Sequence, residues 1–457
     1  MHHSRTEAYD SRVGPVHFLG NDVSSMATTG TVANTSDDSI AHGPQDPVQV
    51  HPHLLPGSVT NADRNDPSET FIEYVSRTFP SEREVDIMLT RKMRRRRGPV
   101  YAGASLRAMT GHVAALLRGH GIEKFEISDA RWFSGGASKI QMGFTLHWDE
   151  PGVGRAATRL VARMEPAESL NSTSRRREYE LLQAFAGVIP VPRVYWVDPD
   201  GTWFPEPALI YAYAEGSSKP NKAMGKVAGI GTNYGPELRQ RLAPQFIEYL
   251  ARIHTFEHEQ VAFDAFDRPE VGTTQSALWQ LNRARRIWEE DRGEDLPLME
   301  VASNWLERNL PVLDCISVVH GDYRSGNFLF DESTARITAI LDWERGYLGD
   351  RHRDLAWTTA EQYGHWSEDG KTFLASGIAS TQELLDRYEA ISGLRVDPIR
   401  MRYYRVFNCY QIVVTALASS YRVVSLGKTH QDVLVAWIEA AAYGAMEELR
   451  REMERSL

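Results

Sequence analysis

Runs of apolar and β-branched residues predict a group of β-strands between residues 124 and 216. EKFEISDARWF and KIQMGFTLHW are separated by a small Gly-containing stretch, and the turn DEPGVGR leads to a third run, AATRLVAR. RRREYELLQAF then has a helical pattern and follows Asn171-Ser172-Thr173, which is suited to start a helix. Two short runs, RVYWV and ALIYAY, complete the set. Five strands with one helix inserted after the third predict a small α+β lobe.

Helical patterns dominate on both sides of this lobe. Before it, SLRAMTGHVAALLRGHG is amphipathic and ends on a glycine, as helices often do. After it, beyond Pro236, the apolar residues of ELRQRLAPQFIEYLARIHTF recur at helical spacing; they are Leu238, Leu242, Phe246, Leu250 and Ile253. Only residues 318–343 interrupt this second region with short strands. We therefore expect a helical extension at 67–123, an N-lobe at 124–216 and a helical C-lobe at 217–457.

Three further segments lie outside these elements or carry unusual charge. Residues 1–66 are rich in small, polar and histidine residues without periodicity, so we expect a disordered leader, with ordered structure from Phe71. The loop SSKPNKAMGKVAGIGTNYG after Gly216 is long for a connector and is expected to be a mobile lid. Six basic residues between Arg91 and Arg97 predict an exposed helix face or a clamp on an acidic neighbouring surface, in preference to a phosphate site.

Composition narrows the class of protein. At 457 residues, with 42% hydrophobic and 25% charged residues, the chain is long enough for well-formed cores and has the make-up of a globular protein. A net charge of −10 argues against nucleic-acid binding as the main role. The two cysteines, Cys315 and Cys409, lack metal-ligand spacing, and neither a membrane-spanning run nor an apolar leader is visible. We therefore expect a cytoplasmic protein without disulfides, zinc or a membrane partner.

The stretch VVHGDYRSGNFLF, residues 318–330, places a polar loop between two apolar segments, where chemistry is often found. Asp322 heads this loop, and its carboxylate could orient a substrate hydroxyl and accept its proton. Asn327 provides a neutral oxygen suited to a hard cation, and Asp342 ends the apolar run that follows. A carboxylate for the hydroxyl, with an Asn and an Asp for Mg²⁺, is the set of groups that phosphoryl transfer needs.

Three more features stand in the chain order that a kinase needs. The stretch SGGAS between the first two strands could lay backbone N–H groups over phosphates; its residues are Ser134, Gly135, Gly136, Ala137 and Ser138. Arg163 ends the third strand, as a phosphate-pairing cation would, and Glu178 in the next helix could hold it in place. Each of these features alone has a purely structural explanation. Asp322 could likewise only cap a turn, beside a His320 buried in the core. Their common order favours a kinase.

From Ser105 to Tyr421 the chain resembles the aminoglycoside phosphotransferase family of small-molecule kinases. It is most similar to the branch whose members are also found fused to acyl-CoA dehydrogenase domains. The stretches that carry the resemblance are FSGGASKIQMGFTL, LVARMEP, RRREYELLQAF, IPVPRV, VVHGDYRSGNFLF, ILDWERGYLGDRHRDLAW and GIASTQELLDRYEAISGLRVDP. The family has a protein-kinase-like two-lobed fold, which implies an N-lobe of about five antiparallel strands with one helix and a mostly helical C-lobe.

The resemblance also implies a role for each matching residue. Asp322 would be the catalytic carboxylate, and Asn327 with Asp342 would hold Mg²⁺. His320 would support the catalytic loop, and Asp354, in DLAW, would brace its backbone from the start of a helix. The ATP contacts would come from SGGAS, from Arg163 in the place of the usual kinase lysine, from Glu178, and from the linker that contains Tyr211, Ala212 and Tyr213.

Two departures from the family pattern stand out. The family commonly has Gly-Asp-Pro before the bracing Asp, whereas this chain has Gly349-Asp350-Arg351, so we expect a different turn there. Residues 1–66 have no counterpart in the resemblance.

The acceptor of the phosphoryl group is the open question. Between Arg400 and Lys428 there are five basic residues and no acidic ones, which counts against a polycationic aminoglycoside; they are Arg400, Arg402, Arg405, Arg422 and Lys428. The aromatic residues of the same stretch recur at helical spacing and are expected to pack in the core, with a wall for an acyl substrate as the alternative; they are Tyr403, Tyr404, Phe407, Tyr410 and Tyr421. The related branch acts on hydroxyacyl-CoA thioesters, so we expect such an acceptor.

Other function classes remain as alternatives. An aminoglycoside or macrolide phosphotransferase shares the fold and the chemistry. A non-catalytic nucleotide-binding module is disfavoured because Asp322 and Asp342 are both present. A protein kinase is disfavoured because the segment between Asp342 and Asp354 is too short for a typical activation loop.

Overall fold

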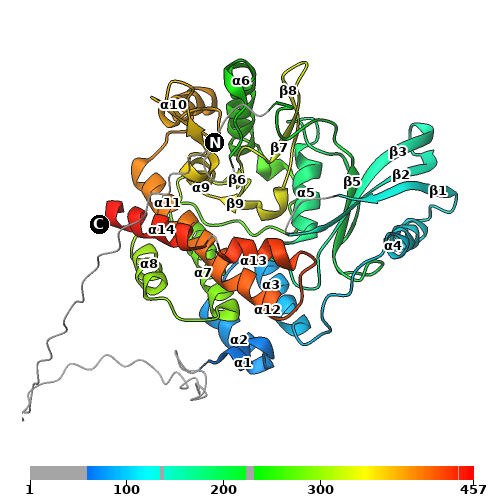
Figure 1. The fold of residues 1–457 in the computed structure, drawn as a ribbon, viewed down its shortest axis with the longest axis horizontal. Helices are drawn as coiled ribbons and strands as arrows, with labels where there is room; N and C mark the ends of the chain where they lie inside the picture. The colour runs from blue at the N-terminus through cyan, green and yellow to red at the C-terminus, as the bar shows by residue number, and fades with distance from the viewer. Residues whose placement is uncertain (1–58, 134–137, 223–230, 441, 457) are drawn as a thin grey trace, which may run out of the picture. The chain divides into compact units, whose positions relative to one another are not determined.

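The structure is a computed structural model that describes residues 59–133, 138–222, 231–440 and 442–456 (Figure 1). Ser134, Gly135, Gly136 and Ala137 lie outside the described residues, as do residues 1–58 and the middle of the loop expected to be a lid. Helix α1 (Asn61–Asn65) starts before Phe71 and falls within the segment expected to be a disordered leader. Its N-cap Thr60 and Asp63 form a reciprocal capping box, which the search for hydrophobic periodicity could not detect in so short a helix.

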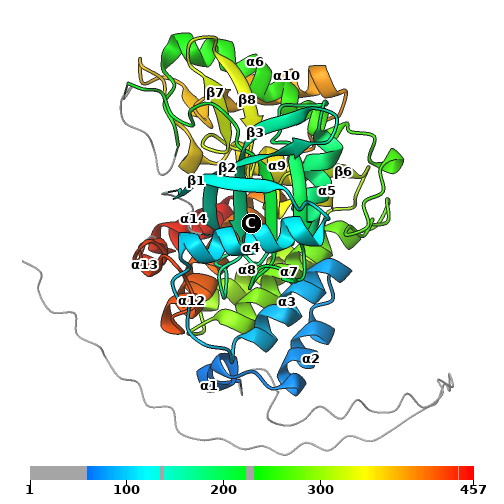
Figure 2. The ribbon, with the colours of Figure 1, turned by 90° about the vertical axis from the view of Figure 1, so that its right-hand side faces the viewer.

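The N-lobe is built on the five-stranded antiparallel sheet that the sequence predicts. Its strands are β1 (Phe125–Trp132), β2 (Ile140–Glu150), β3 (Gly154–Met164), β4 (Val194–Asp198) and β5 (Ala208–Ala212), in the order β1-β2-β3-β5-β4. Helix α5 (Arg175–Phe185) follows β3 and starts at the N-cap Ser174. Helix α4 (Leu106–Gly119) lies across one face of the sheet and shares a core with β2, β3 and β5 (Figure 2). The predicted lobe is therefore confirmed.

The C-lobe is mostly helical. Its main helices are α6 (Gly235–His254), α7 (Gln275–Asp291), α8 (Pro297–Arg308), α9 (His352–Thr358), α10 (Thr381–Ser392), α11 (Pro398–Val413), α12 (Ser420–Ser425), α13 (Asp432–Ala440) and α14 (Ala442–Ser456), with the π-helix η5 (Val414–Ser419) after α11. Two strand pairs interrupt them, β6 (Ser317–Val319) with β9 (Tyr347–Gly349) and β7 (Phe328–Asp331) with β8 (Arg336–Ile340). The described part of the chain holds no helix that is long and apolar enough to cross a membrane.

A small sheet in the C-lobe was missed by the sequence reading, which placed strands only at 318–343. Strands β10 (His365–Trp366), β11 (Phe373–Ala375) and β12 (Ala379–Ser380) form it. Strands of two or three residues are too short to show a period of two, so sequence pattern could not reveal them.

Most of the aromatic and basic side chains between Arg400 and Lys428 make structural contacts. Tyr403, Tyr404, Phe407 and Tyr410 are almost fully buried, which confirms that this aromatic stripe packs in the core. The basic residues of the stretch do not form one surface. Arg400 binds Asp314, Arg422 and Lys428 donate to backbone carbonyls, and Arg402 and Arg405 are exposed. Three of the five basic residues are thus used in structural contacts, and the inference from their charge to the acceptor stays a prediction.

The basic cluster at Arg91–Arg97 is a clamp on acidic neighbours, as the sequence predicts. It lies at the end of helix α3 (Arg83–Arg95), which packs beside α7. Arg96 is buried between Glu168 and Asp291, and its Nη2 atom lies 2.6 Å from Asp291 Oδ1. Lys92 Nζ also lies 2.9 Å from Asp291 Oδ1. These ion pairs join the N-terminal extension to the C-lobe.

We predict that Arg96→Gln lowers the free energy of unfolding by about 3–5 kcal/mol, because it leaves buried carboxylates without their cation. Urea denaturation followed by tryptophan fluorescence measures the change. Arg94→Gln is the matched control, because Arg94 lies in α3 and its pair with Glu69 of α2 (Glu69–Thr78) is exposed, and such pairs contribute about 1 kcal/mol or less. Equal effects of the two substitutions would contradict a buried clamp.

Candidate active site

The loop at residues 320–327, here called the HGD loop, connects the buried strands β6 and β7. Gly321 has φ +81°, a left-handed conformation that residues with a side chain rarely adopt. A Cβ atom at this position would lie 2.6 Å from the backbone oxygen of Arg345, so the close approach of the two segments also requires glycine. The sequence His-Gly-Asp thus places Asp322 on a sharp turn that packs against the segment after β8.

Asp354 binds the backbone of the HGD loop from the first turn of α9. Its Oδ2 accepts the N–H of His320 at 2.6 Å, and its Oδ1 accepts the N–H of Gly321 at 2.8 Å. His254 Nε2 lies 3.2 Å from Asp354 Oδ2 and Tyr388 lies on the other side of the ring, at 2.9 Å from Nδ1. All of these groups are buried, so the loop position is fixed by charge-assisted hydrogen bonds away from water.

His320 connects the HGD loop to the segment that carries Asp342. Its Nε2–H donates to the backbone oxygen of Leu341 at 3.0 Å, and its Nδ1 accepts the N–H of Asp322 at 3.2 Å. This pattern requires a neutral ring with the proton on Nε2. Burial lowers the pKa of His320 and so favours that neutral form. The contacts are structural, as the resemblance implies.

Three donors hold the Asp322 carboxylate. Trp357 Nε1–H donates to Oδ1 at 2.6 Å, and Arg324 Nε–H donates to the same oxygen at 3.0 Å. Asn327 Nδ2–H donates to Oδ2 at 2.7 Å. The side chain retains 17% exposure, so a hydroxyl from outside the protein can reach it. Trp357 was not expected from the sequence, although its place in DLAW, three residues after Asp354, puts both on the same side of α9.

Asn327 and Asp342 are brought together by a backbone hydrogen bond, because the N–H of Leu341 donates to the backbone oxygen of Asn327 at 2.8 Å. The Asn327 amide nitrogen is used on Asp322, which leaves its oxygen as the atom for a ligand. Asp342 has φ +62° and is 41% exposed at its side chain. A left-handed non-glycine residue is costly and occurs most often at functional sites.

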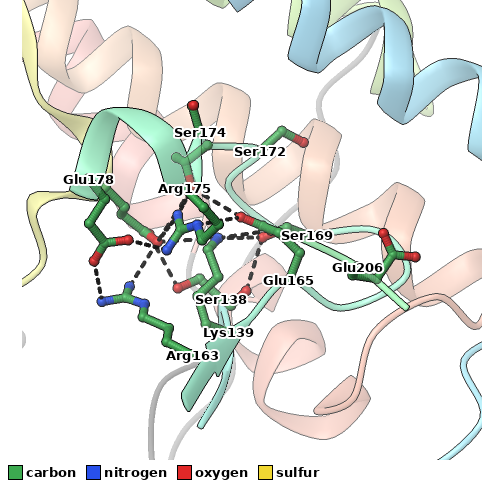
Figure 3. Close-up of polar contacts among 12 residues, drawn as sticks. Ser138, Lys139, Arg163, Glu165, Ser169, Ser172, Ser174, Arg175, Glu178 and Glu206 are labelled. Carbon is green, nitrogen blue, oxygen red and sulfur yellow. Dashed lines mark hydrogen bonds and ion pairs between the residues drawn. The ribbon is translucent and has the colours of Figure 1, made fainter. Parts of the chain in front are cut away.

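Arg163 connects the N-lobe sheet to this region through Asp342, and Figure 3 shows its pairing with Glu178. Its guanidinium lies 2.9 Å from Asp342, 3.1 Å from Glu178 and 2.8 Å from Glu344. Burial alone would lower the pKa of Arg163, but the surrounding carboxylates hold that pKa well above its usual value. The predicted pairing of Arg163 with Glu178 is present, and Asp342 is also a partner.

Two charged residues of this network were missed by the sequence reading. Lys139 has no exposed side-chain surface and lies 3.2 Å from both Glu165 and Glu344. Glu344 also binds Arg163 and accepts a 3.3 Å hydrogen bond from Ser138, the one described residue of SGGAS. Burial would raise the pKa of Glu344, but Lys139 and Arg163 hold it well below its usual range. Lys139 directly follows SGGAS and Glu344 follows Asp342 by two residues, so adjacency to the motifs was the available signal.

The predicted adenine linker is placed at the end of β5. The N–H of Ala212 donates to Arg193 and the N–H of Tyr213 donates to Arg159, so these two residues retain only their carbonyl groups for a ligand. Tyr213 stacks on Phe133, with 5.9 Å between ring centroids. Tyr211 faces Arg163, and burial raises the pKa of its hydroxyl to about 12. The structure therefore brings Tyr211 to the charge network, whereas Ala212 and Tyr213 lie at the end of β5, between the β3 and β4 sides of the sheet.

The turn Gly349-Asp350-Arg351 was expected to differ from the Gly-Asp-Pro turn of the family pattern. Its backbone has the conformation that a proline would impose. Arg351 has φ −59°, within the range that a proline ring fixes, and Asp350 Oδ1 accepts the N–H of His352 at 3.0 Å to start α9. The Arg351 side chain binds Asp314 at 2.8 Å. Arg351 thus has a backbone angle compatible with proline, and its side chain forms an ion pair.

With this geometry in view, the comparison with known proteins is clear. The model of the phosphotransferase enzyme family matches residues 148–391, more than half of the chain. The chain belongs to the phosphotransferase enzyme family. The matched range contains β3, α5, the HGD loop and α9, which are the elements that supply the site.

Individual proteins extend this finding. The chain is 26% identical over 212 residues to mouse acyl-CoA dehydrogenase family member 10, covering 46% of this chain and 19% of the relative. It is 28% identical over 248 residues to chicken acyl-CoA dehydrogenase family member 11, covering 52% of this chain and 30% of the relative. The chain thus spans less than a third of these two proteins. It is also 31% identical over 103 residues to an aminoglycoside 3'-phosphotransferase of Streptomyces fradiae, covering 22% and 35%.

A solved structure supports the fold. The chain has a TM-score of 0.54 and 21% identity to a protein of Ralstonia eutropha that was assigned as an aminoglycoside phosphotransferase, covering 76% of this chain and 98% of that one. The two-lobed, protein-kinase-like architecture expected from the sequence is therefore confirmed.

The candidate site offers oxygen donors that suit Mg²⁺. The amide oxygen of Asn327 and the carboxylate of Asp342 are hard ligands, and Mg²⁺ in nucleotide sites is held by one or two such groups together with phosphates and water. In the described ranges, no group of three or more His, Cys, Asp or Glu side chains forms a metal site. The residues present fit a metal shared with a nucleotide.

We predict that stability falls as the pH drops below about 6.5, because burial lowers the pKa of both His254 and His320. Below the ordinary histidine pKa of about 6.5, the unfolded chain binds protons that the folded chain does not, so unfolding is favoured by up to about 1.4 kcal/mol per pH unit for each histidine. Urea denaturation at pH 7.5, 6.5 and 5.5 measures this dependence. His254→Gln should reduce the slope, whereas His147→Gln, at an exposed position, should not; identical slopes in all three proteins would contradict the assignment.

Proposed function

We propose that the protein is an ATP-dependent small-molecule kinase that transfers the γ-phosphoryl group of Mg-ATP directly to a substrate alcohol. Asp322 carries this proposal. Its carboxylate is fixed by Trp357, Arg324 and Asn327 on a loop that Asp354 holds in place, and it remains accessible. Such a carboxylate can orient a hydroxyl for in-line attack and accept its proton.

The remaining residues of the site have complementary roles in this proposal. Asn327 and Asp342 would hold Mg²⁺, which when bound neutralises charge on the phosphates. Arg163, kept in place by Glu178, would face the phosphates, and the turn Ser134–Ser138 would cover them. The linker at Tyr211–Tyr213 would contact adenine. Because Arg163 is already held by Glu178, Asp342 and Glu344, its electrostatic effect requires little rearrangement during the reaction.

A hydroxyacyl-CoA is the acceptor that we propose. The support comes from the mouse and chicken relatives, whose names refer to acyl-CoA and which match this chain over about half its length. Phosphorylation of the hydroxyl would turn it into a leaving group for later catabolic steps.

An antibiotic phosphotransferase is the second candidate. It is supported by the matched segment of the Streptomyces fradiae aminoglycoside 3'-phosphotransferase. A module that binds nucleotide without catalysis is the third candidate, and it gives no reason for three donors to hold Asp322.

We predict that Asp322→Asn lowers phosphoryl transfer by about 100- to 10,000-fold and leaves nucleotide affinity unchanged. Asparagine keeps the size of the side chain but cannot accept the proton. Mass spectrometry after incubation with Mg-ATP would detect the phosphorylated product in a panel of 3- and 4-hydroxyacyl-CoAs, aminoglycosides, macrolides and choline. Wild-type turnover in the variant would refute the role of Asp322, and the phosphorylated member of the panel distinguishes the candidate functions.

We predict that Asp342→Asn weakens binding of a non-hydrolysable ATP analogue roughly 10-fold or more in the presence of Mg²⁺ and has little effect in its absence. Asparagine tolerates the left-handed backbone at this position, so the substitution tests the charge more than the conformation. Calorimetric titrations with and without Mg²⁺ measure both affinities. A loss of affinity that is independent of Mg²⁺ would contradict a metal-binding role.

A further inference from the structure

Trp357 of α9 makes the shortest of the three side-chain hydrogen bonds to the Asp322 carboxylate. Its Nε1–H donates to Oδ1 at 2.6 Å, compared with 3.0 Å for Arg324 on the same oxygen and 2.7 Å for Asn327 on Oδ2. The Trp357 side chain is only 4% exposed, so this hydrogen bond to a charged group is shielded from water. A tryptophan side chain has a single polar atom, and here that atom is used on Asp322.

The two oxygens of the Asp322 carboxylate are occupied unequally. A carboxylate offers about four lone-pair positions, two on each oxygen. Oδ1 accepts from both Trp357 and Arg324, so both of its positions are filled. Among the residues that the structure describes, Oδ2 accepts only from Asn327, which leaves one position for a hydroxyl. The open position therefore lies on the oxygen that is bound to Asn327, one of the two residues proposed to hold Mg²⁺.

An aromatic stack restrains the ring of Trp357. The guanidinium group of Arg345, from the 3₁₀ turn η3 (Trp343–Arg345), lies 5.2 Å from the centroid of this ring. Tyr363 packs against the same indole, with 5.3 Å between the ring centroids, and Arg324 lies 5.1 Å from the centroid of Tyr363. The stack thus begins at Arg345 and ends at Arg324. Because Trp357 and Arg324 both donate to Oδ1 of Asp322, one stack restrains both donors.

The cation at the start of this stack is kept at a cost to stability. Arg345 is 8% exposed, and among the described residues it forms no ion pair within 4.0 Å. Removing such a charge from water costs several kcal/mol, whereas a cation–π contact contributes about 2 kcal/mol. Burial and the charge of Arg353 lower the pKa of Arg345, whereas the carboxylate of Asp322 raises it, so Arg345 and Asp322 attract each other. Arrangements that oppose stability in this way persist most often at functional sites.

We infer that Trp357 is a positioning residue for phosphoryl transfer: by filling Oδ1 of Asp322, it directs the acceptor hydroxyl to Oδ2, on the side of Asn327. This role rests on the proposed kinase function, whereas the hydrogen bond itself does not. The hydroxyl oxygen forms the new bond to the γ-phosphorus, its proton passes to Oδ2, and the bond from the γ-phosphorus to the β-phosphate oxygen breaks. Without the indole N–H, a hydroxyl can approach either oxygen, and the fraction of productive encounters falls.

Trp357→Phe removes the N–H and keeps an aromatic ring beside Arg345 and Tyr363. With the panel member that the wild type phosphorylates, we expect kcat to fall by about 10- to 100-fold and KM for ATP and acceptor to change by less than about 3-fold, because orientation is lost and binding is not. Trp148→Phe is the matched control and should keep the wild-type kcat, because Trp148 is buried in the N-lobe core, where its Nε1–H donates to Thr158 Oγ1 at 3.0 Å. Equal effects of the two substitutions would overturn the proposal.

A double-mutant cycle separates a role through Asp322 from a general role in the fold. If Trp357 acts through the carboxylate, Trp357→Phe should lower transfer by less than about 3-fold once Asp322→Asn has been introduced. A structural role would lower transfer by the same factor in both backgrounds, so additive losses would overturn the proposal. If Trp357→Phe does not fold, 3-benzothienylalanine at position 357 keeps the bulk of the ring and removes the N–H. The same loss of kcat is expected from it, and wild-type turnover would contradict the role of Trp357.

The hydrogen bond is tested without phosphoryl transfer by ¹H–¹⁵N NMR of the indole groups. The chain has 11 tryptophans, and the signal that Trp357→Phe removes belongs to Trp357. A hydrogen bond to a carboxylate moves an indole proton downfield, so we expect the Trp357 signal to move upfield in Asp322→Asn and the Trp148 signal to stay in place. An unchanged Trp357 signal would overturn the proposal. A wild type that shows the shift but phosphorylates nothing would refute the kinase proposal and leave Trp357 as the residue that holds Asp322.

Discussion

The structure of the site depends on keeping charged side chains paired after they leave water. Removing one ion from water costs several kcal/mol, so each buried charge requires a partner at a defined place. Glu344 shows the consequence, since it binds Arg163 from β3 and Lys139 from the start of β2. Because these partners belong to the N-lobe sheet and Glu344 belongs to η3, the network fixes the sheet against the segment that carries Asp342. The two halves of the site are thereby held in register.

The same network explains how a strained residue is maintained. Asp342 has φ +62°, which costs of the order of 1 kcal/mol or more for a residue with a side chain. The Asp342 carboxylate forms an ion pair with Arg163, and the preceding residue, Leu341, forms a backbone hydrogen bond with Asn327. Both contacts hold Asp342 in this conformation. The strain directs the carboxylate toward Arg163 and the exposed side of the site. With a relaxed backbone, the Asp342 side chain would point in another direction. The strained conformation therefore determines where its carboxylate lies.

Local patterns in the sequence predict the parts of the structure that depend on local physics. The five strands and α5 follow from periodicity and capping, and Asp322, Asn327 and Asp342 follow from residue type and order. The contacts of Lys139, Glu344 and Trp357 depend on segments far apart in the chain, so only the folded structure reveals them. The contacts of the basic stretch at Arg400–Lys428 could not be predicted for the same reason: the partners of Arg422 and Lys428 include backbone oxygens of distant segments. Charge in a sequence does not report whether tertiary contacts neutralise it.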